Sequence, residues 1–252
     1  LSEVCADTSF TAKKNRAISL NGLGNIYMTL GNYERADSAL RMALEGERQL
    51  HSALGQAINY ANLGSIFEHR GQTDSAWVYY RKSMALNTEA GSTLGISLCH
   101  TYFGSLYEKA RQYGKATEEY ETAYRLMQES KDEWHALNTL IALAGISNAM
   151  HDEAKTLDYL SRAKPIAERI LSKEHLADIY TLYYKHYKRT GDHRSALYAH
   201  EQATNLKDSV LDMEKMNRIQ NISLNIERNL SRLCPQSQHQ PAVSCQGNRG
   251  HG

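Results

Sequence analysis

Small and apolar residues recur along this chain at a spacing of forty positions. Gly24, Gly64 and Gly104 are each preceded by a large apolar residue and followed, three positions later, by an aromatic one. Two looser copies follow, with Ala144 and Tyr184 in the glycine column. Alanine stands twelve positions after each of the three glycines: Ala36, Ala76 and Ala116. Because several columns keep this register over five copies, the chain is predicted to consist of stacked structural repeats.

Each copy is predicted to hold two helices. In the first copy, apolar residues follow the 3-4-3 spacing of a helical face: Leu20, Leu23, Tyr27 and Leu30. Gly31-Asn32 then interrupts the pattern, and Gly directly after a helix is a common C-terminal signal. The second helix continues with Ala36, Leu40, Ala43 and Leu44. The later corners are Gly71-Gln72, Arg111-Gln112, His151-Asp152 and Gly191-Asp192. A forty-residue step fits two helices of about 16–18 residues with short turns.

The glycines inside the first helices need a physical reason. Gly in a helix interior costs about 1 kcal/mol relative to Ala. The expected gain is a close helix approach, in which the absence of a Cβ at Gly24 lets the Ala36 face of the partner helix come near. A large side chain at Gly64 or Ala116 is therefore expected to overpack the seam between the two helices.

These columns resemble the tetratricopeptide repeat signature, W-x2-L-G-x2-Y…A-x3-F…P. The first three copies read Leu20-x2-Leu23-Gly24-x2-Tyr27…Ala36-x3-Leu40, Tyr60-x2-Leu63-Gly64-x2-Phe67…Ala76-x3-Tyr80 and His100-x2-Phe103-Gly104-x2-Tyr107…Ala116-x3-Tyr120. The resemblance covers about residues 17–210. It implies an all-α fold, a right-handed α-α superhelical solenoid of about five helix hairpins plus a C-terminal helix. The forty-residue period resembles the long-helix type found in the sensor and docking regions of bacterial signalling regulators.

The predicted organisation follows from the repeat register. Residues 1–16 are expected to be the stub of a preceding helix or repeat, and residues 17–210 the solenoid. The five repeats are placed at about 17–53, 54–93, 94–133, 134–173 and 174–210. A capping or coiled-coil helix is expected at 206–232. The Pro-, Gln- and Gly-rich residues 233–252 are expected to form a disordered tail.

The charged C-terminal helix leaves two roles open. Its apolar residues keep 3-4 spacing and could form a coiled-coil seam and a homodimer: Met216, Ile219, Ile222, Ile226, Leu230 and Leu233. The seam is short for sustained heptads, so the helix could instead cover the open end of the last repeat. Light scattering on chains with and without residues 206–252 separates assembly from capping.

In a curved solenoid of this kind the first helices line the concave side. Stepping by forty along them brings together small polar residues and one tyrosine: Asn21, Asn25, Asn62, Ser65, Tyr102 and Ser105. An Asn amide presents both donor and acceptor, so it can pair with the backbone of an extended peptide. Related repeat proteins use Asn in this way, so the resemblance implies a peptide- or protein-binding groove. The alternative is that these residues are hydrated polar side chains on a helix face.

The groove ends differ in charge. Lys185 and Arg189 give one end a basic character that could meet an acidic partner or simply face water. The repeats that grip carboxylate tails of chaperones resemble one another in having Lys and Arg at columns where this chain has Asn21, Leu98 and Tyr102. Without those cations a dicarboxylate lacks its bidentate partners, so that subclass is disfavoured.

Composition removes several function classes. The 29 basic and 28 acidic residues leave a net charge of +1, so no broad basic field is available for nucleic acid. No apolar run reaches the roughly 18 residues that span a bilayer. The four Cys residues are scattered, without the paired spacing of a zinc site. Phosphate-binding and nucleophile-elbow motifs are not found, so neither a metal nor another cofactor is expected.

The resulting expectation is a non-catalytic scaffold that binds a protein or peptide segment, the sensing or docking part of a bacterial regulator. An assembly module acting through residues 206–232 is the alternative, and a hydrolase with an unrecognised site is a further one. Because the chain starts at Leu1 rather than Met, a targeting or membrane segment could belong to a longer protein. The expected location is therefore the bacterial cytoplasm or periplasm, with a possible membrane tether.

Overall fold

The computed structural model describes residues 10–233, and within that range the chain forms ten helices and no strand. The first helices of the repeats are α2 (Phe10–Thr29), α4 (Ala53–His69), α6 (Thr93–Lys109), α8 (Glu133–Ala149) and α10 (Lys173–Thr190). The second helices are α3 (Tyr33–Gln49), α5 (Thr73–Glu89), α7 (Tyr113–Glu129), α9 (Glu153–Arg169) and α11 (His193–Leu233). The predicted all-α architecture of stacked helix hairpins is confirmed.

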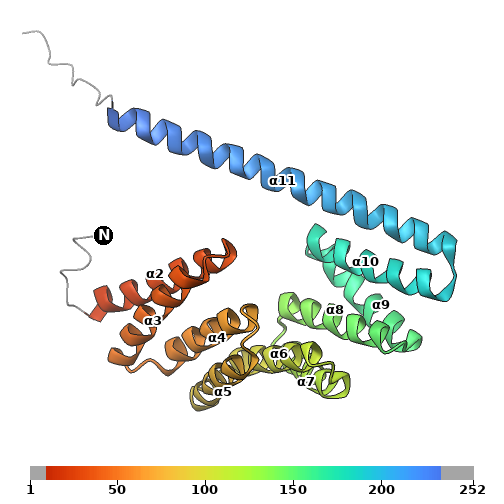
Figure 1. The fold of residues 1–252 in the computed structure, drawn as a ribbon, viewed down its shortest axis with the longest axis horizontal. Coiled ribbons are helices and arrows are strands. Elements are labelled where there is room, and N and C mark those ends of the chain that lie inside the picture. The colour runs from red at the N-terminus through yellow and green to blue at the C-terminus, as the bar shows by residue number, and fades with distance from the viewer. Residues whose placement is uncertain (1–9, 234–252) are drawn as a thin grey trace, which may run out of the picture. The chain divides into compact units, whose positions relative to one another are not determined.

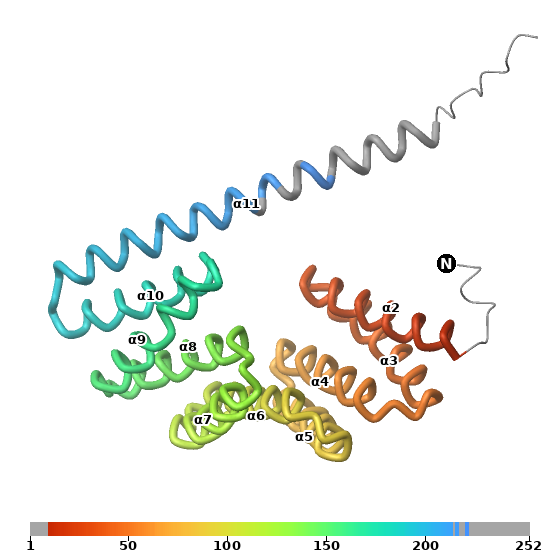
Figure 2. Tube along the Cα trace, turned by 180° about the vertical axis from the view of Figure 1, so that it is seen from behind, coloured from red at the N-terminus to blue at the C-terminus, as the bar shows by residue number. Residues whose placement is uncertain are grey.

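The helices through Leu206 form one compact unit in which neighbours in sequence are neighbours in space (Figure 1). Helices α2, α4, α6 and α8 each pack most closely on their own second helix, and that second helix packs in turn on the first helix of the next repeat. Successive first helices also touch, less closely. Among the described residues, no comparable contact joins the second helices to one another. The first helices α2, α4, α6, α8 and α10 therefore lie on the inner side of the curve, and α3, α5, α7 and α9 lie on the outer side (Figure 2).

The glycine column lies where the two helices of a hairpin come closest. A Cβ built on Gly64 would be 2.5 Å from the Tyr80 ring, and one on Gly104 would be 2.9 Å from Tyr120. Gly24 faces Leu40 in the same way, at 2.6 Å. The expected close approach is thus present. The contacting residue lies sixteen positions after each glycine, one helical turn beyond the Ala36 column named from the sequence.

Sharp corners separate consecutive helices at a step of twenty residues. Gly31, Gly71 and Gly191 take left-handed conformations, as their place after a helix suggests. Arg111 and His151 take the same conformation without being glycine, with φ of 57° and 62°. A second series lies between repeats and was not marked by the sequence analysis: His51, Gly91, Lys131 and Leu171. At every described corner except Gly191, backbone hydrogen bonds from the two corner residues satisfy the last carbonyls of the preceding helix, which holds the conformation.

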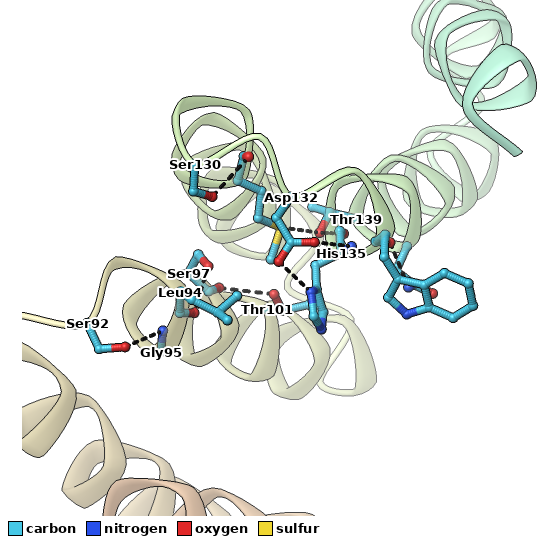
Figure 3. Close-up of polar contacts among 12 residues, drawn as sticks. Ser92, Leu94, Gly95, Ser97, Thr101, Ser130, Asp132, His135 and Thr139 are labelled. Atoms are coloured by element: carbon cyan, nitrogen blue, oxygen red, sulfur yellow. Dashed lines mark hydrogen bonds and ion pairs between the residues drawn. The ribbon is translucent and has the colours of Figure 1, made fainter. Parts of the chain in front are cut away.

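The residue after each corner begins the next helix. Seven of these residues accept a hydrogen bond from the backbone N–H three positions on: Asn32, Ser52, Ser92, Asp132, Asp152, Ser172 and Asp192. Figure 3 shows two of them, with Ser92 accepting from Gly95 and Asp132 from His135. Because such caps satisfy otherwise unpaired N–H groups, corner and cap together mark the twenty-residue step.

Replacing Leu171 with glycine is expected to stabilise the protein. Leu171 is 83% exposed and sits at φ 55°, a conformation that costs a residue with a Cβ about 1–2 kcal/mol. Leu171→Gly should therefore raise the free energy of unfolding by about 1 kcal/mol in urea titrations. Leu197→Gly is the control, because Leu197 is exposed inside α11, where glycine should lower stability by a similar amount. A destabilised Leu171→Gly protein would contradict this account.

The C-terminal part differs in form from the sequence expectation. No Gly or Pro interrupts residues 193–233, and the structure has a single 41-residue helix there, α11, in place of a short repeat helix followed by another. Residues 207–233 of the described range belong to a second unit. The tail at 234–252 and residues 1–9 of the expected stub lie outside the described residues, and Phe10–Arg16 open α2. Within the described part, no helix is long and apolar enough to cross a membrane.

Candidate binding face of the first helices

The two predicted asparagines of the first repeat, Asn21 and Asn25, form a ladder with Asn59 of α4, which the sequence analysis did not single out. Asn25 Nδ2 donates to Asn21 Oδ1 at 3.3 Å, and Asn21 Nδ2 donates to Asn59 Oδ1 at 3.0 Å. Asn59 in turn donates to the Gly55 carbonyl at 2.9 Å. Asn25 remains exposed at the outer end of this ladder. The structure therefore brings Asn21 and Asn25 together, and their binding role stays a prediction.

The two predicted serines are engaged inside the fold. Ser65 hydrogen-bonds to the Tyr80 hydroxyl. Ser105 Oγ donates to Glu68 Oε1 at 2.6 Å, a contact between neighbouring first helices. Sequence reasoning placed both serines on the groove because their columns face inward, but it could not see that a buried carboxylate and a buried phenol already use them.

Glu68 is the centre of a network that links α4, α5 and α6. Besides the Ser105 bond, it accepts from the Tyr80 hydroxyl at 2.5 Å and from Lys109 Nζ at 2.7 Å. Burial acts to raise the Glu68 pKa, but the three hydrogen bonds together outweigh it, so the pKa lies below its ordinary value. The network fixes the inner face of the second and third repeats as one unit.

A pocket of about 250 Å³ lies between α4 and α6 and includes two predicted residues, Asn62 and Tyr102. Tyr102 stacks on Tyr80 with 4.7 Å between ring centroids, and burial raises the pKa of its phenol to about 12. Asn62 Nδ2 is buried without a hydrogen-bond partner, as is Oδ1 of Asn87, a residue only 4% exposed. Buried amide atoms that lack partners are costly, so a ligand that supplies them gains binding energy.

Sequence reasoning missed the aliphatic rim of this pocket. Leu54, Ile58 and Leu94 are between 43% and 46% exposed, and half-buried Leu98 completes the wall. The signal was available, since Leu54 and Leu94 are forty residues apart and Ile58 and Leu98 repeat the step one turn later. It was overlooked because apolar residues in a helix are normally assigned to the core.

A second, larger pocket of about 420 Å³ lies between α8 and α10 and contains the predicted Lys185. Two carboxylates line it as well, Glu108 from α6 and Asp178 from α10. Arg189, the other residue of the expected basic end, pairs with Glu153 at 3.3 Å. This end of the groove is therefore less basic than Lys185 and Arg189 alone suggest.

The described residues include no cluster of three His, Cys, Asp or Glu side chains that could hold a metal ion. What this face offers chemically is an apolar recess beside unpaired amide atoms, and a second recess with carboxylate acceptors.

Comparison with solved structures gives the fold. BtubC (BKLC) from P. vanneervenii aligns over 96% of this chain and 90% of its own, with 16% identity and a TM-score of 0.66. The apo form of RapI aligns over 84% and 89%, with 13% identity and a TM-score of 0.63. A Rap protein complexed with competence and sporulation factor aligns over 79% and 66%, with 12% identity and a TM-score of 0.59.

Comparison of sequences gives the family of the N-terminal repeats. No curated protein sequence matches the chain significantly. The sequence model of the tetratricopeptide repeat matches residues 15–89, the part with the most regular columns. The match identifies residues 15–89 as tetratricopeptide repeats, and the helix-hairpin stack gives the described chain the all-α solenoid fold of tetratricopeptide-repeat proteins.

Proposed function

We propose that this protein is a non-catalytic scaffold whose inner face binds a segment of another protein or a peptide. The observation that carries the proposal is the pocket between α4 and α6, where exposed aliphatic side chains surround a recess with unpaired amide atoms. Isolated exposed apolar residues are common on protein surfaces, but a contiguous apolar recess with a few polar atoms is typical of a ligand site.

The pocket matches one apolar side chain of a peptide with its adjoining backbone. Burying a Leu-sized side chain is worth about 1.5–3 kcal/mol. Asn62 Nδ2 is a donor and can pair with a peptide carbonyl, while the nearby ladder of Asn21 and Asn25 offers further donors and acceptors along the inner face. An extended segment that crosses α2, α4 and α6 would use both kinds of contact.

Structural neighbours support this function and suggest its setting. One of them is a Rap protein whose structure was solved in complex with competence and sporulation factor. By analogy we propose that this chain is the sensing or docking part of a bacterial regulator. The assembly role of residues 206–232 stays a prediction, because most side chains beyond Lys215 lie outside the described residues.

Leu94→Asp is expected to weaken peptide binding strongly without harming the fold. Leu94 is 43% exposed and lies in the first turn of α6, where a carboxylate is favourable for the helix. Dodecapeptides would be selected from a random phage-displayed library on the unmodified protein. Their fluorescein-labelled versions would then be titrated by fluorescence polarisation. We expect a loss of affinity of about tenfold or more.

Val78→Asp is the matched control, because Val78 is an aliphatic residue of α5, on the outer side, and is 51% exposed. It should leave affinity unchanged. Leu54→Asp, in the first turn of α4 and in the same pocket, should repeat the Leu94→Asp result. Selected peptides that bind both pocket variants as tightly as the unmodified protein would refute the α4–α6 pocket as the binding site.

A further inference from the structure

Two glutamates forty residues apart occupy equivalent positions but have different surroundings. Glu68 accepts three hydrogen bonds, as described above. Glu108 accepts one from a described residue, the Tyr120 hydroxyl at 3.1 Å. Burial, largely uncompensated, raises the Glu108 pKa above its ordinary value, whereas the Glu68 pKa is lowered. The pKa values of these two equivalent carboxylates are therefore shifted in opposite directions, because Glu108 has fewer hydrogen-bond donors than Glu68.

The missing donors can be identified by the repeat register. Glu68 receives Ser105 and Lys109 from the next first helix, 37 and 41 positions later. The same offsets from Glu108 lead to Gly145 and Ala149, which have no donor side chain. The space is not filled by other groups: it is the 420 Å³ pocket lined by Glu108, Gly145 and Ala149. Nothing lies within 4 Å of a Cβ built on Gly145.

A separate observation indicates that this pocket lacks a hydrogen-bond donor. Asn148 lines it, and its side-chain Oδ1 is buried and accepts no hydrogen bond. Asp178 of α10 adds a second carboxylate. Lys185 lies on the same wall but makes no ion pair with a described residue. Two carboxylates against one ammonium give the lining a formal charge of −1, and its acceptors outnumber its donors.

We propose that the pocket between α8 and α10 binds the ammonium or guanidinium group of a basic side chain, on the segment that the inner face recognises. Such a group would occupy the place that Lys109 fills in the preceding repeat, where its Nζ lies 2.7 Å from Glu68. A cation supplies only donors, which is what Glu108, Asp178 and the Asn148 oxygen require. The claim that the cation belongs to the bound protein segment rests on the proposed function. The claim that the pocket binds a cation does not.

The test begins with a free cation rather than a peptide. N-acetyl-L-arginine amide has the guanidinium without a carboxylate, and N-acetyl-L-citrulline amide is its neutral counterpart. Amide resonances of Gly145 and Thr181 would be followed by ¹⁵N NMR during titration. We expect saturable shifts with the arginine compound alone. Glu108→Gln, which keeps an acceptor for Tyr120, should weaken binding about fivefold.

Ala149→Lys provides the decisive variant. Ala149 is exposed at the end of α8, as Lys109 is at the end of α6, so a lysine there should fit and should pair with Glu108 as Lys109 pairs with Glu68. We expect it to abolish the shifts. Glu89→Gln, an exposed glutamate at the end of α5, is the control and should change nothing. Equal shifts with the citrulline compound, no shifts at all, or unchanged binding by Ala149→Lys would each overturn the cation site.

Selected peptides separate this inference from the proposed function. Peptides that need Leu94, contain Lys or Arg and lose affinity in Ala149→Lys support both. Peptides that need Leu94 but bind Ala149→Lys normally would preserve the scaffold function. They would show that the bound segment does not fill the cation site, and so would overturn the claim that the cation belongs to that segment.

Discussion

Gly64→Ala is expected to lower the free energy of unfolding by about 1–3 kcal/mol, although alanine is the better helix former. The added Cβ would lie 2.5 Å from Tyr80 Cε1, closer than carbon atoms can pack. The Tyr80 ring is rigid and fully buried, so it cannot yield by a simple rotation. The Tyr80 hydroxyl also donates a hydrogen bond to Glu68 Oε2 at 2.5 Å, so a displaced ring would disturb the Glu68 network as well. Urea unfolding followed by circular dichroism measures the loss.

Gly22→Ala is the matched control for this prediction. Gly22 also lies inside a first helix, but nothing approaches within 4 Å of a Cβ built there. The same substitution should therefore stabilise the protein by up to about 1 kcal/mol through helix propensity. Opposite signs for the two variants would establish close helix approach as the role of the glycine column. A stabilised Gly64→Ala protein would reject it.

Glu68→Gln is expected to destabilise the protein by about 1–3 kcal/mol at neutral pH. The Glu68 side chain is 11% exposed and accepts from three donors. An amide offers one acceptor oxygen, and its NH₂ group would face donors that then lose their partner. Because the network joins three helices, the loss should appear as a lower urea midpoint for the second and third repeats.

The pH dependence of this effect has a definite sign. The folded-state pKa of Glu68 lies below its ordinary value of 4.5, so its contribution to stability is fully present above pH 4.5. It is lost as the pH falls through the lower folded-state pKa. The difference in stability between the unmodified protein and Glu68→Gln should therefore be constant near neutrality and shrink in acid. A difference that grows as the pH falls would contradict the assignment.

Glu108→Gln is the internal comparison, since it makes the same change forty residues later. Burial raises the Glu108 pKa, so its ionised form disfavours the folded state above that pKa. Removing the charge should leave stability unchanged or higher at neutral pH. Glu68→Gln and Glu108→Gln are thus expected to differ in sign, which the shared sequence motif alone would not suggest.

Much of the fold could be predicted from periodicity. The glycine and alanine columns indicated helix hairpins with a close seam, and the structure has them. The corners were harder, because Arg111 and His151 adopt a conformation that usually marks glycine. Capping residues carry the signal there: Ser52, Asp132 and Asp152 recur on the twenty-residue step. Backbone hydrogen bonds to the helix end can hold such a residue left-handed at a modest cost.

The candidate site was only partly accessible to sequence reasoning. Asn62 and Tyr102 were assigned to the inner face, and they line a pocket there. Ser65 and Ser105 were assigned to it as well, but the fold uses both in the network around Glu68. A column in a repeat shows which way a residue faces. It does not show whether a partner within the fold has already taken its hydrogen bond.

The sequence by itself determined the forty-residue repeat step, the helix hairpins, the all-α fold class and the face that turns inward. These features depend on local periodicity and on the size of the side chains where two helices meet. Only the tertiary structure decided which inward residues are unsatisfied. Glu68 and Glu108 occupy the same place in the motif, and their difference comes from Ser105 and Lys109, which reach Glu68 from the neighbouring repeat. Hydrogen-bond satisfaction and open volume depend on residues nearly forty positions apart, so they became visible only when the repeats were stacked.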